Sequence, residues 1–204
     1  MLKDEFVTKV SFAVLLQDDF SREGFLVDRT RVFLRESGRE AQENPSKYYV
    51  FVDLSGTDHT LAIENKYYFE KEVNVSIPGL DPRRPIVAVT MKPKSFYPFP
   101  FTATLIRGSI TDSAGAPIAD AALTVVGSTV SNTSEPEGRF VLYFGPLTED
   151  DIVVSGGQRL VKVGASTTLQ IRVEHPSYAA KTVTIGTVEE GAAKLLATPI
   201  TLSP

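Results

Sequence analysis

Apolar side chains recur at every second position along much of the chain, and this period of two is typical of β-strands. In the first half, Val10, Phe12, Val14 and Leu16 share one face of the first such segment. Turn-forming pairs such as Ser55-Gly56 separate the segments. The pattern predicts strands over residues 10–16, 48–54, 61–63, 73–77 and 87–91.

The same alternation continues from Leu105 to the end of the sequence. Gly156-Gly157 divides two apolar runs, and this pair accepts the positive φ angles of a tight hairpin turn. Residues 189–196 are the one helix-compatible segment, and they are too short to organise a domain. The predicted strands are residues 105–111, 122–126, 139–144, 152–155, 158–163, 167–174, 181–185 and 199–202.

Short strands at regular spacing, without long amphipathic helices between them, indicate antiparallel sandwiches rather than βαβ units. The segment KPKSFYPFPF, residues 92–101, interrupts the pattern with three prolines, which lack the amide that a central strand needs. We therefore expect an all-β fold with two antiparallel β-sandwich domains in tandem, joined by a Pro/aromatic connector. The first domain, residues 1–104, includes the connector 92–104, and by fold-level analogy it is immunoglobulin-like or fibronectin-like. The second covers residues 105–204.

Composition narrows the function. The chain has 204 residues, 42% of them hydrophobic and 23% charged, which is close to globular averages and supports two folded domains. Its net charge of −4 and its scattered basic residues make nucleic acid an unfavourable partner. There is no cysteine, so disulfides, thiolate metal sites and a thiol nucleophile are excluded.

The N-terminal residues favour synthesis in the cytoplasm. Asp4 and Glu5 stand where a secretory signal would carry basic and then apolar residues. No apolar run reaches the roughly 18 to 20 residues that span a bilayer. Delivery or export by a dedicated machine stays open.

From Ile106 onward, a series of motifs resembles the carboxypeptidase regulatory-like domain. The motifs are RGSITD at residues 107–112, GAPI at 115–118, EGRFVL at 137–142, HPSY at 175–178 and KTVTI at 181–185. The resemblance implies a seven-stranded, transthyretin-like sandwich that serves as an accessory module. In these motifs Gly108 allows close strand packing, residues 112–115 make a turn, and Gly138 reverses the chain before Phe140 enters the core.

The sequence departs from the family pattern in two places. Residues 134–137, Ser-Glu-Pro-Glu, stand where the family usually has Thr-Asp, and residues 147–157 lengthen the middle of the domain. Both departures indicate either loops specialised for this protein or drift. An immunoglobulin-like or fibronectin-like domain, an aromatic-proline connector and a regulatory-like domain, without a secretion signal, form a combination similar to what accessory proteins of phage-tail-like particles could show.

Candidate chemistry is sparse. His59 and His175 are far apart in sequence and each stands in a turn-like setting, so we interpret both as surface residues rather than zinc ligands. The sequence has no G-x-S-x-G, HExxH, GxGxxG or Walker-type motif. Carboxylates cluster at residues 18–19, 135–137, 149–151 and 189–190 without calcium-loop spacing, so we expect structural or solvating roles; adventitious calcium stays open. No catalytic residue, metal ligand or cofactor site is predicted.

Aromatic clusters are the most informative candidates for a partner-binding or interdomain surface. Neighbours in a strand face opposite ways, so only one of Tyr48 and Tyr49 can lie in the core. Rings with polar tips suit wet interfaces and sugar-stacking platforms. The competing interpretation is that the connector rings pack between the domains. The candidate residues are Tyr48, Tyr49, Tyr67, Tyr68, Phe96, Tyr97, Phe99 and Phe101.

These observations favour a non-catalytic structural or protein-interaction module that is part of a larger assembly, with an unidentified protein partner. The alternative is a carbohydrate-binding module, which requires solvent-exposed rings along one face. An acid-base or metal-assisted enzyme is the third hypothesis. It requires His59 or His175 within bonding reach of a carboxylate in a concave pocket.

Overall fold

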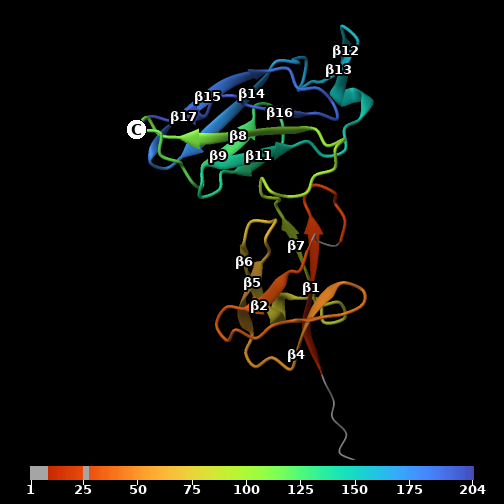
Figure 1. The fold of residues 1–204 in the computed structure, drawn as a ribbon. Helices are drawn as coiled ribbons and strands as arrows, with labels where there is room; N and C mark the ends of the chain where they lie inside the picture. The colour runs from red at the N-terminus through yellow and green to blue at the C-terminus, as the bar shows by residue number, and fades with distance from the viewer. Residues whose placement is uncertain (1–8, 25–27) are drawn as a thin grey trace, which may run out of the picture. The chain divides into compact units, whose positions relative to one another are not determined.

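The computed structural model describes residues 9–24 and 28–204, and its strands confirm the all-β fold (Figure 1). The chain divides into two compact units, Met1–Pro93 and Lys94–Pro204. The segment 94–104, which we expected in the first domain, therefore belongs to the second unit. Its contacts, described below, give the physical reason. The described residues include no helix that is long and apolar enough to cross a membrane.

Two sheets form the first unit. One is four-stranded with the order β3-β4-β1-β7, and the other is three-stranded with the order β2-β5-β6. A short 3₁₀ turn, η1 (Ile77–Gly79), follows β6. The strands are β1 (Val10–Asp18), β2 (Arg31–Leu34), β3 (Gln42–Glu43), β4 (Tyr48–Val52), β5 (Asp58–Glu64), β6 (Lys71–Ser76) and β7 (Ile86–Met91).

The inner faces of these sheets form the core of the first unit. The predicted alternation of β1 places Phe12, Val14 and Leu16 in the interior, each at most 2% exposed. The ring of Phe12 lies 4.9 Å from that of Phe51 in β4 and 6.4 Å from that of His59 in β5. The two sheets therefore face each other across a shared apolar layer, as a sandwich requires.

Two sheets also form the second unit, with the orders β10-β9-β14-β15 and β11-β8-β16, and β17 pairs with β8 as well. A separate hairpin consists of β12 and β13, preceded by the 3₁₀ turn η2 (Glu149–Asp151). The strands are β8 (Leu105–Thr111), β9 (Ala122–Val125), β10 (Ser131–Thr133), β11 (Arg139–Tyr143), β12 (Ile152–Ser155), β13 (Gln158–Val161), β14 (Leu169–His175), β15 (Tyr178–Gly186), β16 (Ala193–Leu195) and β17 (Ile200–Thr201).

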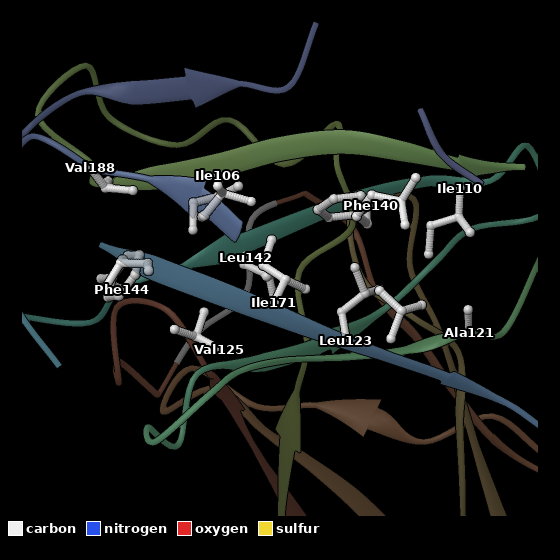
Figure 2. Close-up of a cluster of buried hydrophobic side chains, with 14 of the residues drawn as sticks. Ile106, Ile110, Ala121, Leu123, Val125, Phe140, Leu142, Phe144, Ile171 and Val188 are labelled. Carbon is white, nitrogen blue, oxygen red and sulfur yellow. The ribbon is translucent and has the colours of Figure 1, made fainter. Parts of the chain in front are cut away.

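The core of the second unit lies between its sheets, where side chains such as Ile106, Leu123, Phe140 and Ile171 are at most 1% exposed (Figure 2). Gly108 packs as its motif predicts. A Cβ atom on Gly108 would lie 2.8 Å from Cζ of Phe140, so only hydrogen fits at this position.

Both units contain parallel pairs, whereas we expected antiparallel sheets throughout. β7 runs parallel to β1, and β16 and β17 run parallel to β8. The remaining strand pairs are antiparallel. Alternation indicates which face of a strand is buried, but it carries no information about strand direction.

Four short strands were not predicted from the sequence: β2, β3, β10 and β16. In β2, three successive residues are buried, Val32, Phe33 and Leu34, so the period of two is absent. β16 lies inside the segment 189–196 that we considered compatible with a helix. Pairing with β8 decides the conformation of this segment, because tertiary contacts override a weak local preference.

Candidate functional site

The outer face of β8 and β11 is the most unusual surface of the second unit. Strand alternation turns Ile106 and Leu142 toward the core, so Arg107, Val141 and Tyr143 face away from it. An outward-facing residue on a two-layer sandwich is ordinarily exposed to solvent. Val141 is nevertheless only 1% exposed and Tyr143 only 7%. Ser95, Phe96 and Phe99 of the connector contact side chains of this face.

Polar contacts fix the start of the connector. The backbone amide of Ser95 donates a hydrogen bond of 2.5 Å to Oε1 of Glu135, which lies in the turn between β10 and β11. The carbonyl of Ser95 accepts a hydrogen bond from Nη1 of Arg107. Glu135 is 4% exposed, so a buried carboxylate holds one backbone group of the connector while an arginine holds the next.

The two cationic side chains of this face also hold the connector rings. The guanidinium of Arg139 lies 4.3 Å from the ring centre of Phe96, and that of Arg107 lies 5.4 Å from the ring centre of Phe99. The ring of Phe99 lies 4.6 Å from Tyr97 and 5.7 Å from Tyr143. Cation–π and ring contacts of this kind each stabilise by about 0.5 to 1.5 kcal/mol. These contacts explain why residues 94–104 belong to the second unit.

Partial burial affects the polar groups that hold the connector. Burial lowers the pKa of Arg107, and the charge of Glu135 opposes that effect. Two buried polar atoms, Ser95 Oγ and Arg139 Nε, have no hydrogen-bond partner among the residues that the structure describes. The connector is thus fixed mainly through its backbone and its rings, not through the serine hydroxyl.

Two connector rings remain open to solvent. Phe96 is 60% exposed although its ring covers Arg139, and Phe101 is fully exposed. Leu195 in β16 is paired with Arg107, so its side chain leaves the sheet on the same outer face, and it is 74% exposed. We call Phe96, Phe101 and Leu195 together the connector surface.

The other predicted aromatic residues are less accessible. Tyr68 is 0% exposed and its hydroxyl donates a hydrogen bond of 3.0 Å to Oδ2 of Asp18, so this ring lies in the core of the first unit. Tyr48, Tyr49 and Tyr67 are half-buried, so neither residue of the Tyr48-Tyr49 pair is a core residue. Burial raises the pKa of Tyr49, and the nearby charge of Glu43 adds to the rise.

The structure corrects our interpretation of one histidine. We expected His59 at the surface in a turn, but it lies in β5 with a side chain only 7% exposed. Its Nδ1 lies 2.7 Å from Oε1 of Glu36, and its buried Nε2 has no partner among the described residues. The pKa of Glu36 is lowered, first by a backbone hydrogen bond and then by His59. His175 ends β14, where its Nδ1 accepts a hydrogen bond of 3.1 Å from the amide of Ser177.

The carboxylate clusters take structural roles. Arg159 bonds Glu149 at 2.9 Å and also bonds Glu190, and Asp151 caps η2 through Thr148. Over the described ranges, no three histidine, aspartate or glutamate side chains converge as metal ligands would.

Each unit contains a concave region in which a reactive arrangement could lie. A cavity of about 360 Å³ in the first unit is lined by Leu16, Gly24, Asp28, Arg29, Thr30, Glu43, Lys47 and Tyr49. Another, of about 210 Å³, lies in the second unit beside Leu160, Glu189 and Lys194. Neither lining contains a histidine. The His59–Glu36 pair meets the distance requirement of the enzyme hypothesis, but it lines neither of these two cavities.

Comparisons with known proteins give no family. No family model matches the sequence, and no curated protein matches it. A type II cohesin–X-dockerin complex from Acetivibrio cellulolyticus includes a solved chain that is 24% identical over 48% of this chain, with a TM-score of 0.30, and the match spans 56% of that chain. A streptococcal ancillary pilin is 10% identical, with a TM-score of 0.30 and coverage of 98% of this chain and 63% of that one. The shaft pilin SpaA from Lactobacillus rhamnosus GG is 9% identical, with a TM-score of 0.27 and coverage of 97% and 98%. Similarity of this size does not decide a function.

The aromatic connector is recognisable in the sequence, but the residues that hold it are not. Glu135 was visible as a member of a carboxylate cluster and of a departure from the family pattern, and Arg107 only as part of a motif. A signal was nevertheless present. The strand positions of Arg107 and Arg139 are on the outer face, opposite the core positions Ile106 and Phe140, which marks both arginines as available to a covering segment.

Proposed function

We propose that this chain is a non-catalytic module that binds another protein through the connector surface. The observation that carries the proposal is the contrast within one short segment: Tyr97 is only 7% exposed, whereas Phe96 is 60% exposed and Phe101 is fully exposed. Exposed rings on a segment that is already fixed bind at a lower entropic cost than rings on a loose loop. Aromatic residues, phenylalanine among them, are also enriched in the cores of protein interfaces.

The same arrangement gives less support to the other hypotheses. A sugar platform uses flat exposed rings, but Tyr68 and Tyr97 are buried and the exposed connector rings are phenylalanines without a polar tip. None of the solved structures named above is a phage-tail component. The assignment of the second unit to the carboxypeptidase regulatory-like domains is likewise our proposal, and it rests on the motifs and on the tight packing at Gly108.

Site-specific photo-crosslinking of the full chain in its native source tests the proposal. A photoreactive amino acid at position 96 or 101 should capture a discrete protein partner. The same probe at Val126, a 43% exposed position on the second unit, is the matched control and should not capture that partner. Recovery of the chain only as a free monomer from all three positions would contradict the proposal. Capture of glycans instead of protein would favour the carbohydrate alternative.

A further inference from the structure

The hairpin β12–β13 extends away from the two sheets of the second unit (Figure 1). Its turn is Gly156-Gly157, and both glycines have positive φ angles, 58° and 81°. This is the two-residue hairpin that the sequence predicts. Its strands pair in a regular antiparallel register from Ile152↔Val161 to Ser155↔Gln158.

The outer edge of β13 is held by hydrogen bonds to the segment that follows β15. The amide of Val161 donates to the carbonyl of Val188 at 2.9 Å, and the amide of Glu190 donates to the carbonyl of Arg159 at 2.9 Å. Residues 188–190 therefore cover the outer edge of β13. Arg159 of β13 also forms ion pairs with Glu149, which precedes β12, and with Glu190. The hairpin is a preformed element and not a loose loop.

The outer edge of β12, unlike that of β13, is not covered by another segment of the described chain. In a two-residue hairpin the closing pair is hydrogen-bonded and the pairs alternate from there, so the backbone groups of Val154 and Ile152 face away from β13. The Val161–Val188 bond agrees with this alternation. The amide of Ile152 donates a hydrogen bond to the carbonyl of Glu149. Within residues 9–24 and 28–204, no hydrogen bond uses the carbonyl of Ile152 or either backbone group of Val154.

The side chains of β12 do not protect this edge from pairing with another strand. Val154 is 65% exposed and Val153 is 37% exposed. No charged residue occurs between Ile152 and Gln158, and this stretch has no proline and no bulge. Soluble proteins normally protect an edge strand with a lysine, a proline or a bulge, because an open apolar edge pairs with other strands. An edge strand that lacks a charged residue, a proline and a bulge can pair with another strand.

We propose that β12 of one chain pairs antiparallel with β12 of a second copy, so that the hairpins join two chains. The distribution of charge along the strand suits a second copy of the chain, and it favours the antiparallel direction. The acidic residues 149–151 precede the strand, and its far end, residues 155–158, is uncharged. Antiparallel pairing places the acidic end of each strand beside the uncharged end of the other, whereas parallel pairing would bring the two acidic ends together. The pairing is also self-complementary, as a twofold interface requires.

The contact is small, and its size predicts weak, reversible association. A four-residue strand buries much less than the roughly 1,200 Å² of a standard stable interface. We therefore expect a monomer–dimer equilibrium at protein concentrations of roughly 10 μM to 1 mM. This second contact is separate from the connector surface, so it is independent of the proposed function.

Sedimentation velocity of the full chain over that concentration range tests the proposal. The wild-type chain should change from monomer toward dimer as concentration rises. Val154→Pro should stay monomeric, because proline removes the outward amide of Val154 while leaving the hydrogen bonds inside the hairpin. Val154→Lys, which keeps the amide and adds a charge to the edge, should also stay monomeric. Val126→Lys and Phe96→Ala, changes at exposed positions outside the hairpin, should dimerise as the wild type does.

Two results would overturn the proposal: a monomeric wild type at every concentration, or dimerisation of both Val154 variants to the wild-type extent. Hydrogen exchange at residue 154 adds a local readout in the wild type, in which this amide should be protected only in concentrated samples. Protection of the amide in the dilute monomer would show that the chain itself covers the edge. The exchange of the Val161 amide in each variant reports whether the hairpin is still folded.

Discussion

Ser95 and Glu135 are joined by a hydrogen bond of 2.5 Å from backbone amide to carboxylate, although 40 positions separate them in the sequence. The bond fixes the connector to the turn that precedes β11. Because Glu135 is buried, its loss would leave the amide of Ser95 without an acceptor in a site that excludes water. Leaving such a donor unsatisfied costs about 1 to 3 kcal/mol.

Glu135→Ala should therefore loosen the connector. Trypsin should cleave after Lys94 faster in this variant than in the wild type, and the free energy of unfolding in urea should fall by about 1 to 3 kcal/mol. Ser95→Ala is the control, because Oγ of Ser95 makes no hydrogen bond within the described residues and its loss should change neither quantity appreciably. Equal cleavage rates in both variants would show that Glu135 does not hold the connector.

Much of the fold was predictable because it depends on local alternation. Residues 10–16 and 169–174 have the period of two, and both form strands as predicted. Strand direction and the short strands were not predictable in this way. The parallel pairing of β7 with β1, and of β16 with β8, depends on contacts between distant residues, which alternation does not encode.

The candidate site was predictable only in part, for a similar reason. The prolines and rings of the connector are visible in the sequence as a single run. The side chains that hold this run, Glu135, Arg107 and Arg139, come from other strands and turns. The burial of His59 was not predictable from its turn-like neighbours, because it depends on the packing of β5 against β1.

Tyr68→Phe should destabilise the first unit. The hydroxyl of Tyr68 donates to Oδ2 of Asp18 at 3.0 Å, and both residues are at most 1% exposed. Removing the hydroxyl withdraws a donor from a buried carboxylate, which costs about 1 to 3 kcal/mol. Urea unfolding followed by circular dichroism measures the loss. Tyr67→Phe, at the neighbouring half-buried position, should change the free energy of unfolding by less than about 0.5 kcal/mol. Similar losses in the two variants would contradict a specific role for the Tyr68–Asp18 bond.

The base of the hairpin should loosen in acid. Hydrogen bonds from Arg159 lower the pKa of Glu149 below its ordinary 4.5, and hydrogen bonds from Thr148 lower the pKa of Asp151 below its ordinary 3.8. A carboxylate whose pKa is lowered by folding stabilises the fold above its unfolded pKa, and this stabilisation is lost as the pH falls through the folded pKa. NMR chemical shifts of Val161 and Lys162 should therefore change below about pH 4. Glu149→Gln should reduce the pH dependence, and an unchanged profile in that variant would assign the effect to other groups.

Replacing Gly138 or Gly157 separates two causes of destabilisation, an unfavourable backbone conformation and a steric clash of the added Cβ atom. Both have positive φ angles, 73° and 81°, so an alanine at either position adopts a left-handed backbone conformation at a cost of about 1 to 2 kcal/mol. Only Gly138 is also crowded: a Cβ there would lie 2.4 Å from the carbonyl oxygen of Ile110, whereas nothing lies within 4 Å at Gly157. Gly138→Ala should therefore lower the free energy of unfolding by about 1 to 3 kcal/mol more than Gly157→Ala does. Urea unfolding of the two variants measures the difference. If the two losses were equal, backbone conformation alone would explain both, and the close approach of Gly138 to β8 would contribute nothing to the stability of the second unit.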